Sequence, residues 1–243
     1  MPVADSEILL SVIIPAYLEE ENIASTVMSL KNYFDGQTYG VEYLVIDDGS
    51  PDKTSEKARN AGADVIRLEN NSGKGAAVRA GMIKGTGKYL LFTDADYPYE
   101  IDAIEKCFTE FNRGADVVIG SRNLGESDRG RERLKRRAIS KIGNLVARIL
   151  ILPGISDTQA GFKCFSRDAA REIFSRTLID GWGFDIEILY LAKIYGLKIG
   201  EVPIRLIPRA TRPSRLKNPT RTALNVLGSI FRVRLNGLLG KYR

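Results

Sequence analysis

The feature that most constrains the fold is the alternation, through the first half of the chain, of short apolar runs with helix-like segments. The runs are mostly apolar and rich in β-branched residues, as are strands buried on both faces of a sheet. Helix-like segments of about a dozen residues separate them, which is typical of a mostly parallel sheet flanked by helices. The predicted strands are 11–15, 41–46, 64–68, 88–93 and 116–119, and the predicted helices are 20–34, 53–60, 75–84 and 100–112.

The second half of the chain continues the pattern less regularly. It opens with a segment rich in Lys and Arg, residues 122–148. We find no internal repeat and no linker, so we expect one α/β domain over residues 1–215 and a C-terminal segment over 216–243. The further predicted strands are 161–165 and 198–204, and the further predicted helices are 167–174, 185–195 and a last one from about Arg221.

The chain of 243 residues contains no histidine. This excludes imidazole as a metal ligand and as a general base, so that such chemistry must use carboxylates, Lys, Tyr or water. The two cysteines, Cys107 and Cys164, form no CxxC motif, which favours two small core residues in a reducing compartment.

The net charge of +6 favours anionic partners, such as phosphorylated substrates or lipid headgroups. A nucleic acid partner is not expected, because acidic residues cluster after successive strands, where they would repel a phosphate backbone. No apolar run approaches the ~20 residues of a membrane span. The segment Met1–Glu7 also lacks the basic region of a signal peptide, so we expect a cytoplasmic protein.

Open parallel sheets bind ligands at the carboxyl ends of their strands, so the residues after each predicted strand are candidates for a site. The first strand leads into Pro15–Glu21, which has three carboxylates instead of a glycine-rich dinucleotide fingerprint. A nucleotide bound there would face this loop with its base or ribose. The second strand leads into Asp47–Ser50, which suits either a helix-capping turn or a carboxylate contact to a base or ribose.

The third and fourth strands lead into candidate phosphate and metal residues. The segment Asn71–Gly75 lacks the glycine spacing of a P-loop, but Lys74 at a glycine-lined helix start suits a nucleotide. The turn Asp94–Asp96 offers two carboxylates at positions i and i+2. Such a pair can bind one Mg²⁺ together with waters and substrate phosphates, and the cation would neutralise a diphosphate leaving group.

The fifth strand leads into Gly120–Arg122, where the basic segment begins. Arg122, Arg136 and Arg137 can bind phosphate through two parallel hydrogen bonds. A solvated basic face is the alternative for most charges of this segment.

The C-terminal segment has the pattern of a basic amphipathic helix. Such a helix suits a membrane surface, and a helix packed on the domain core fits the same pattern. Its apolar positions are Leu224, Leu227, Ile230, Phe231, Leu235, Leu238 and Leu239, and its basic positions are Arg221, Arg232, Arg234, Lys241 and Arg243.

Together these segments resemble the inverting family 2 glycosyltransferases of the GT-A fold, a Rossmann-like α/β fold. Within that family the chain is most similar to dolichyl-phosphate β-glucosyltransferases, and dolichyl-phosphate mannose synthases are related enzymes. The resemblance covers roughly residues 8–235. The motifs that carry it, in order, are Val12–Tyr17 with Glu19, Val45–Ser50, Gly73–Gly75, Thr93–Asp96, Gly120–Arg122, Asp157–Lys163, Trp182–Glu187 and Gly200–Pro203.

The resemblance implies a set of site residues. The nucleotide side would comprise Pro15, Tyr17, Glu19, Asp47, Asp48, Lys74, Asp94 and Ala95. Asp94 and Asp96 would hold the metal, Mg²⁺ or Mn²⁺. The acceptor phosphate would be held by Arg122, Arg136 and Ser140. The sugar or acceptor side would comprise Asp157, Gln159, Trp182, Asp185 and Glu187, and the candidate catalytic residues are Asp96, Asp157 and Arg122.

The resemblance also implies a reaction, which is inverting transfer of a hexose to a polyprenyl (dolichyl) phosphate by a peripheral protein on the cytoplasmic face of a membrane. The Asp157–Gln159 segment favours glucose from UDP-glucose. Mannose from GDP-mannose, N-acetylglucosamine, and a soluble or protein acceptor are alternatives. A lipid phosphate is largely dianionic at neutral pH, so the nucleophile needs no general base, which suits a chain without histidine. Mannose synthases can place a third polar ligand two residues after the second Asp, where this chain has Pro98.

Overall fold

The structure, a computed structural model, describes residues 8–96, 99–124, 152–181, 183–205, 207 and 219–242. In the last helix, side chains are described from residue 228 onward. Several residues of the sequence analysis lie outside the described residues: Pro98, Arg136, Arg137, Ser140, Trp182 and the side chains of Arg221, Leu224, Leu227 and Arg243.

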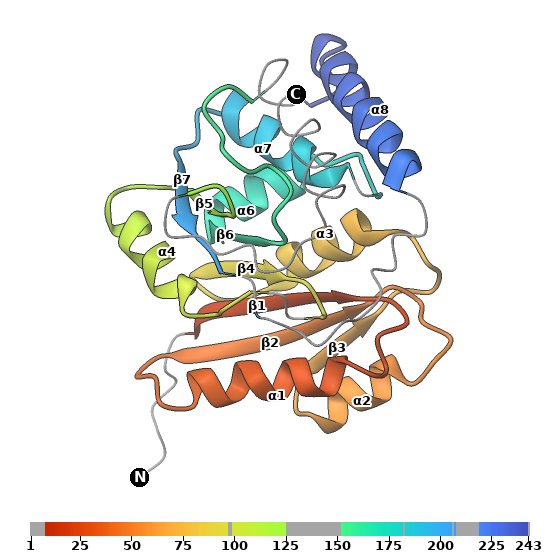
Figure 1. The fold of residues 1–243 in the computed structure, drawn as a ribbon, viewed down its shortest axis with the longest axis vertical. Coiled ribbons are helices and arrows are strands. Elements are labelled where there is room, and N and C mark those ends of the chain that lie inside the picture. The colour runs from red at the N-terminus through yellow and green to blue at the C-terminus, as the bar shows by residue number, and fades with distance from the viewer. Residues whose placement is uncertain are drawn as a thin grey trace.

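Within the described residues, a seven-stranded sheet forms the centre of the molecule, in the order β3-β2-β1-β4-β6-β5-β7 (Figure 1). Neighbouring strands pair in parallel, except that β6 runs antiparallel to both β4 and β5. The strands are β1 (Ile8–Ala16), β2 (Gly40–Asp47), β3 (Asp64–Arg67), β4 (Tyr89–Thr93), β5 (Val117–Ser121), β6 (Phe162–Ser166) and β7 (Ile199–Pro203).

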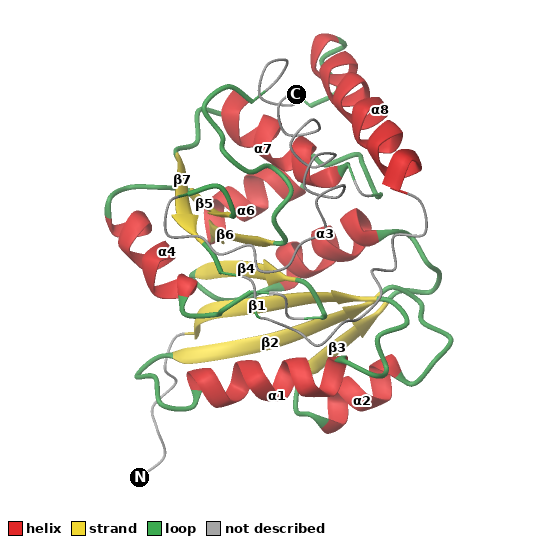
Figure 2. Cartoon of the chain, in the orientation of Figure 1, coloured by secondary structure: helices red, strands yellow, loops and turns green. Residues whose placement is uncertain are grey.

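Helices cover both faces of the sheet, with α1 and α2 on one face and α3, α6 and α7 on the other (Figures 1 and 2). They are α1 (Ile23–Phe34), α2 (Thr54–Asn60), α3 (Lys74–Lys84), α4 (Ala103–Asn112), α6 (Arg167–Phe174), α7 (Phe184–Ile194) and α8 (Pro219–Leu238).

Two apolar cores result, because successive side chains of a strand point to opposite faces. On β1, Ile13 packs into the core beneath α3, α6 and α7, whereas Val12 and Ile14 pack into the core beneath α1, α2 and α4. The two cysteines, Cys107 and Cys164, lie buried in the second core as reduced thiols, and burial raises the pKa of each. This agrees with the core role expected from their spacing.

The predicted α/β fold with a mostly parallel sheet is confirmed, and each predicted strand is present within a few residues of its expected ends. The helix predicted over 20–34 begins only at Ile23, and before it the backbone carbonyl of Glu19 accepts the N–H groups of Asn22 and Ile23 in a turn. The helix predicted over 100–112 begins at Ala103. The direction of β6 is a further finding, since strand periodicity carries no information about direction.

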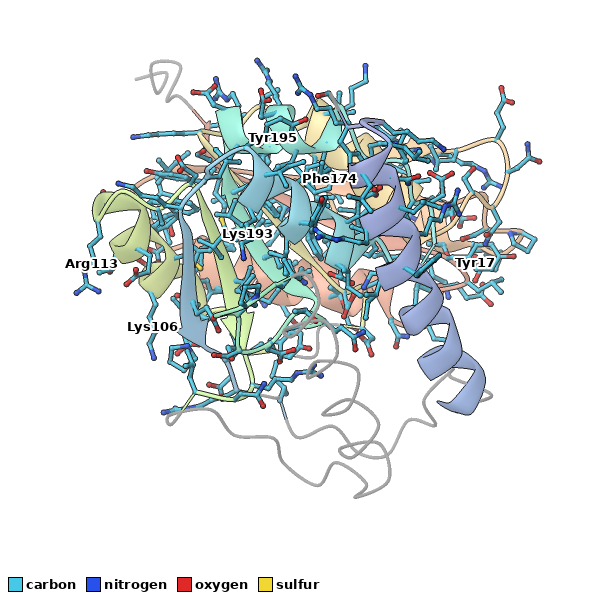
Figure 3. The ribbon with its side chains drawn as sticks, turned by 90° about the horizontal axis from the view of Figure 1, so that it is seen from above. Tyr17, Lys106, Arg113, Phe174, Lys193 and Tyr195 are labelled. Carbon is cyan, nitrogen blue, oxygen red and sulfur yellow. The ribbon has the colours of Figure 1, made fainter. Side chains whose placement is uncertain are left out.

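The last helix, α8, packs beside α7 on the outside of the molecule (Figure 3). Ile230 and Val233 are fully or almost fully buried against the core, so one face of α8 belongs to the domain. On the other face, the side chains of Phe231, Leu235, Leu238 and Leu239 are exposed. None of the helices that the structure describes combines the length and apolarity that crossing a membrane requires.

Candidate active site

The candidate site lies at the edge of the sheet where β1, β2, β4 and β5 end. Residue pairing brings these ends together, since Ala16 at the end of β1 is opposite Asp47 at the end of β2. The antiparallel strand β6 begins at this same edge, where Phe162 is opposite Thr93 at the end of β4. The loop before β6 therefore meets the turns that follow β4 and β5, although these segments are distant in sequence.

The loop after β1 is held in a set shape by the loop after β2. The backbone N–H groups of Leu18 and Glu19 donate to the hydroxyls of Ser50 (3.0 Å) and Thr54 (2.9 Å). Leu18 has a left-handed backbone with φ of 57°, a conformation that costs a non-glycine residue of order 1 kcal/mol and is often found at functional sites. Because these two N–H groups already donate to hydroxyls, they do not offer hydrogen bonds to a phosphate. A ligand at this loop would instead contact side chains.

Three predicted nucleotide residues lie in or beside this loop. Tyr17 is 38% exposed and lies at the periphery of the molecule (Figure 3). Glu19 accepts a hydrogen bond from the side-chain amide of Asn22 at 2.6 Å. Pro15 is buried within β1, and the pairing of β1 with β4 ends at Ile13, so its missing N–H does not interrupt that ladder.

The two aspartates after β2 are buried and bonded to this chain's own backbone. Asp47 is fully buried and accepts the N–H of Ser50 at 2.9 Å, the Ser55 hydroxyl and, at 3.5 Å, the Arg67 guanidinium. Asp48 accepts the N–H groups of Ser72 (2.7 Å) and Gly73 (2.8 Å). Both carboxylates therefore fix the loops around the site, and Asp48 ties β2 to the start of α3.

The turn after β4 carries the predicted metal residues. Asp94 pairs with Lys74 at the start of α3, with 2.6 Å between Oδ1 and Nζ, and the Ala95 carbonyl accepts the Thr26 hydroxyl at 2.7 Å. Burial lowers the pKa of Lys74, but the carboxylates of Asp94 and Asp185 outweigh it, so the pKa lies above its usual range and the ammonium stays charged. Asp96 is exposed.

A divalent cation fits this turn by the chemistry of its donors. Asp94 and Asp96 supply oxygen, which Mg²⁺ and Mn²⁺ prefer, and the exposure of Asp96 leaves room for waters and a diphosphate. Among the described residues, no group of three or more acidic or cysteine side chains is assembled to hold a metal without such ligands. The protein would thus contribute two carboxylates, with Asp94 shared between the cation and Lys74.

Two residues that the sequence reasoning did not select, Gly161 and Tyr99, complete the wall around Asp94. A β-carbon on Gly161 would lie 2.1 Å from Asp94 Oδ2, so position 161 has no room for a side chain. Burial and the charges of Asp94 and Asp157 raise the pKa of Tyr99 to about 12, against the opposing effect of Arg122. The Tyr99 hydroxyl is therefore neutral and lies within the electrostatic reach of all three charged groups.

Arg122 and Asp157 form a nearly buried pair beside this wall. Asp157 accepts from Arg122 Nε at 2.7 Å, from Nη2 at 3.0 Å and from the backbone N–H at 3.2 Å. Burial alone would raise the pKa of Asp157, but these bonds hold it below its usual range. Gln159 donates its backbone N–H to the same carboxylate at 3.2 Å. Asp157 thereby orients the guanidinium that the family resemblance predicts to hold the acceptor phosphate.

Asp185 and Glu187 are two residues apart on α7, but only Asp185 lies near the site. Asp185 pairs with the fully buried Lys163 of β6 at 2.5 Å and acts electrostatically on Lys74, so it lies just behind the Asp94 turn. Glu187 is fully buried and accepts from the Tyr242 hydroxyl at 2.7 Å, away from solvent. The structure thus gathers Lys74, Asp94, Arg122, Asp157 and Asp185, and places Glu187 in the packing behind them.

A mostly parallel sheet with one reversed strand and an Asp-Ala-Asp turn at its carboxyl edge agrees with the GT-A fold that the sequence resemblance predicts. Residues 11–174 match the sequence model described as "Glycosyl transferase family 2". The chain belongs to this family and is a glycosyltransferase.

Relatives that share one name match most of the chain. It is 34% identical over 97% of its length to a protein of Dictyostelium discoideum named dolichyl-phosphate beta-glucosyltransferase, of which it covers 77%. Proteins of the same name from Drosophila melanogaster and Homo sapiens are 36% and 32% identical over 81% and 80% of the chain, which covers 66% of each.

Solved structures share the fold at lower identity. One is glucosyl-3-phosphoglycerate synthase from Mycobacterium tuberculosis in complex with phosphoglyceric acid, with a TM-score of 0.71 and 22% identity over 93% of this chain and 80% of that one. Another crystal structure of that enzyme, in complex with Mn²⁺, UDP-glucose and phosphoglyceric acid, has a TM-score of 0.70 and 20% identity over 93% and 79%.

Proposed function

We propose that this glycosyltransferase moves glucose from UDP-glucose to a dolichyl or other polyprenyl phosphate, with inversion at the anomeric carbon. The names of the relatives at 32–36% identity support the sugar and the acceptor. The UDP-glucose and Mn²⁺ bound to glucosyl-3-phosphoglycerate synthase, which has the same fold, support the donor and the metal. The chain spans 66–77% of these relatives' own lengths.

The observation that carries the proposal is the placement of two oppositely charged groups at one edge of the sheet. The Asp94 turn, with Lys74, is suited to a cation and a diphosphate, and Arg122 is suited to a second phosphate. The two groups lie at neighbouring strand ends, since Asp94 directly follows β4, Arg122 directly follows β5, and both strands pair with β6. A reaction between two anions needs this arrangement, because their repulsion must be screened before they approach within reacting distance.

The donor would lie between the loop after β1 and the Asp94 turn. Tyr17, with Pro15 and Glu19 beside it, would contact the nucleoside, and Asp47 and Asp48 would act by holding the loops around it. Asp94 and Asp96 would hold the cation, which supplies charge neutralisation for the departing diphosphate. Lys74 stays protonated beside Asp94 and would add positive charge on the same side.

The acceptor would approach from the side of Arg122. A polyprenyl phosphate is largely dianionic near neutral pH, so its oxygen attacks without a protein base. Asp157 holds the Arg122 guanidinium in place, so we assign Asp157 an orienting role and not that of a base. Attack from the face opposite the diphosphate inverts the anomeric carbon. Gln159, Asp185 and, outside the described residues, Arg136, Ser140 and Trp182 stay predictions for the sugar and acceptor.

We also propose peripheral attachment to the cytoplasmic face of a membrane, where a polyprenyl acceptor would be reached. The exposed face of α8 supports the attachment. Its apolar side chains Phe231, Leu235 and Leu238 stand at helical spacing, and Leu238 is 72% exposed. Arg232, Arg234 and Lys241 are exposed beside them and suit anionic headgroups. Because Ile230 and Val233 pack on the core, α8 serves the domain and the proposed membrane surface at once.

The proposal is tested with radiolabelled UDP-glucose, GDP-mannose and UDP-N-acetylglucosamine, each incubated with polyprenyl phosphate and with Mg²⁺, Mn²⁺ or chelator. We expect label from UDP-glucose to enter the organic phase in the presence of metal and to stay in water with chelator. Parallel reactions with a soluble phosphorylated acceptor, phosphoglycerate, provide the control. Label transferred only to phosphoglycerate, or only from another donor, would overturn the assignment.

A further inference from the structure

Glu187 occupies an unusual position, because it is a fully buried carboxylate whose described hydrogen bonds all come from neutral groups. Its Oε1 accepts the Tyr242 hydroxyl at 2.7 Å and the Leu178 N–H at 3.0 Å, and its Oε2 accepts the Ile179 N–H at 2.9 Å. Burial raises the pKa of Glu187, and these hydrogen bonds oppose the shift. The carboxylate thus joins the C-terminal end of the chain to the loop between α6 and α7.

That loop is fastened in turn to the start of α3. The Asp180 carbonyl accepts the N–H groups of Gly75 at 2.7 Å and Ala76 at 3.2 Å, and the Asp180 carboxylate pairs with Arg79 at 2.6 Å. The approach leaves no space for side chains, since a β-carbon on Gly75 would lie 2.4 Å from the Ile179 carbonyl oxygen. Two N–H groups that a helix start usually offers to a ligand are therefore bonded to this loop.

The start of α3 carries Lys74, whose ammonium binds Asp94 at 2.6 Å. A continuous series of contacts therefore runs from Tyr242 through Glu187, the loop Leu178–Asp180 and the start of α3 to the Asp94 turn. Tyr242 is itself held firmly, being 2% exposed and accepting the Tyr195 hydroxyl through its backbone carbonyl.

We propose that Glu187 and Tyr242 are positioning residues for the donor site, acting through the loop Leu178–Asp180 on the placement of Lys74 beside Asp94. This inference rests on the proposed function for its account of what binds at Asp94. It gives the segment after α8 a task in donor binding, and it assigns to Glu187 an indirect role in place of the substrate contact that the sequence suggests.

The test compares Tyr242→Phe with a matched control, Tyr39→Phe. Each substitution removes one tyrosine hydroxyl that is bonded to a glutamate, since Tyr39 donates to Glu105 at 3.1 Å, at the far edge of the sheet. Glu187→Gln, which keeps the side-chain volume but loses one acceptor, is the second variant. Thermal unfolding, the affinity for UDP with Mn²⁺ by calorimetry, and amide exchange of the peptide that begins at Gly73 are measured for all variants.

We expect Tyr242→Phe and Glu187→Gln to speed amide exchange at Gly75 and Ala76 and to weaken UDP binding by about three- to tenfold. With a transferase assay, KM for the donor should rise with little change in kcat, and Tyr39→Phe should behave as wild type. Unchanged exchange at α3, unchanged UDP affinity in both variants, or an equal loss in Tyr39→Phe would overturn the inference. A wild-type chain that binds no UDP would overturn the proposed donor, while the exchange data would still report on the series of contacts.

Discussion

Gly161 lies so close to Asp94 that a β-carbon at position 161 would stand 2.1 Å from Oδ2 of the carboxylate. The contact arises because β6 runs antiparallel to β4, so that the residue before Phe162 meets the residue after Thr93. The side of Asp94 away from Lys74 is therefore limited by backbone, and the carboxylate has little freedom to rotate.

Replacement of Gly161 by alanine should impair catalysis far more than stability. The new methyl group must displace the Asp94 carboxylate from Lys74, and an ångström-scale misplacement can cost about 10²-fold in rate. The end of an aspartate can move at little cost to the fold, so Tm should change only slightly. Steady-state kinetics and thermal unfolding measure the two effects, and Gly36→Ala is the control because nothing lies within 4 Å of a β-carbon there. A fully active Gly161→Ala protein would contradict the proposed role of Asp94.

Replacement of Asp96 by asparagine should lower kcat/KM by about 10²–10³-fold, the cost of losing one charged group that stabilises developing charge. Because Asp96 is exposed, the free energy of unfolding should change by no more than about 0.5 kcal/mol. Kinetics at several Mn²⁺ concentrations and urea unfolding test both statements. Near-normal turnover at limiting Mn²⁺ would refute a metal site at this turn.

The Arg122–Asp157 pair should give the protein an acid-sensitive stability. The pKa of Asp157 is lower in the folded chain than the value of about 3.9 in an unfolded one. Its contribution is therefore complete above about pH 4 and is lost as the pH falls through the folded pKa. Asp157→Asn should cost about 3 kcal/mol near pH 7, because the nearly buried Arg122 loses its counter-charge. Urea unfolding between pH 7 and pH 3 should show the two proteins converging at the acid end, and parallel curves would contradict this account.

The exposed apolar face of α8 should be required for binding to lipid. Leu235→Ser combined with Leu238→Ser should reduce sedimentation with anionic liposomes several-fold, because each loses apolar area that the membrane would bury. UDP affinity should be unchanged, since neither side chain takes part in the contacts that end at Asp94. Met28→Ser on α1, at a side chain that is 55% exposed, is the matched control. Equal sedimentation of all variants would argue against membrane contact through α8.

Removal of the whole of α8 would not give a clean test of membrane contact. Ile230 and Val233 are core residues, and Tyr242 bonds Glu187, so truncation near residue 220 would open the core. Point substitutions on the exposed face leave the core residues and the Tyr242–Glu187 bond in place. Core packing holds for one face of the helix and membrane contact stays a proposal for the other, and a periodic pattern alone does not separate the two faces.

The layered fold could be predicted because it rests on local signals. Continuous apolar runs mark the buried strands, and glycines and polar turns punctuate them. The Asp94–Asp96 turn was found in the same way, from its place after a strand. The reversed direction of β6 could not be predicted, since Phe162–Ser166 has the same pattern as a parallel strand.

Long-range contacts explain what the sequence missed. The Glu187–Tyr242 bond joins residues 55 positions apart, and Lys163 is a fully buried lysine whose ammonium is paired with Asp185 and donates to the Ala160 carbonyl. Gly161 carried a weak signal, because a glycine directly before a strand often marks a close approach. Tyr99 carried none. For Asp47 and Asp48, the sequence left capping and ligand contact open, and the structure shows both bonded to nearby backbone.

The left-handed backbone of Leu18 has a consequence for the way in which a donor would arrive. The loop after β1 is fixed before any ligand binds, since the hydroxyls of Ser50 and Thr54 already accept its backbone N–H groups. A nucleoside that binds at Tyr17 would therefore meet a loop that is already ordered. Its binding would not have to offset an entropy cost of ordering this loop. Donor binding at this loop would then need no loop closure, and its rate would depend on diffusion and charge attraction.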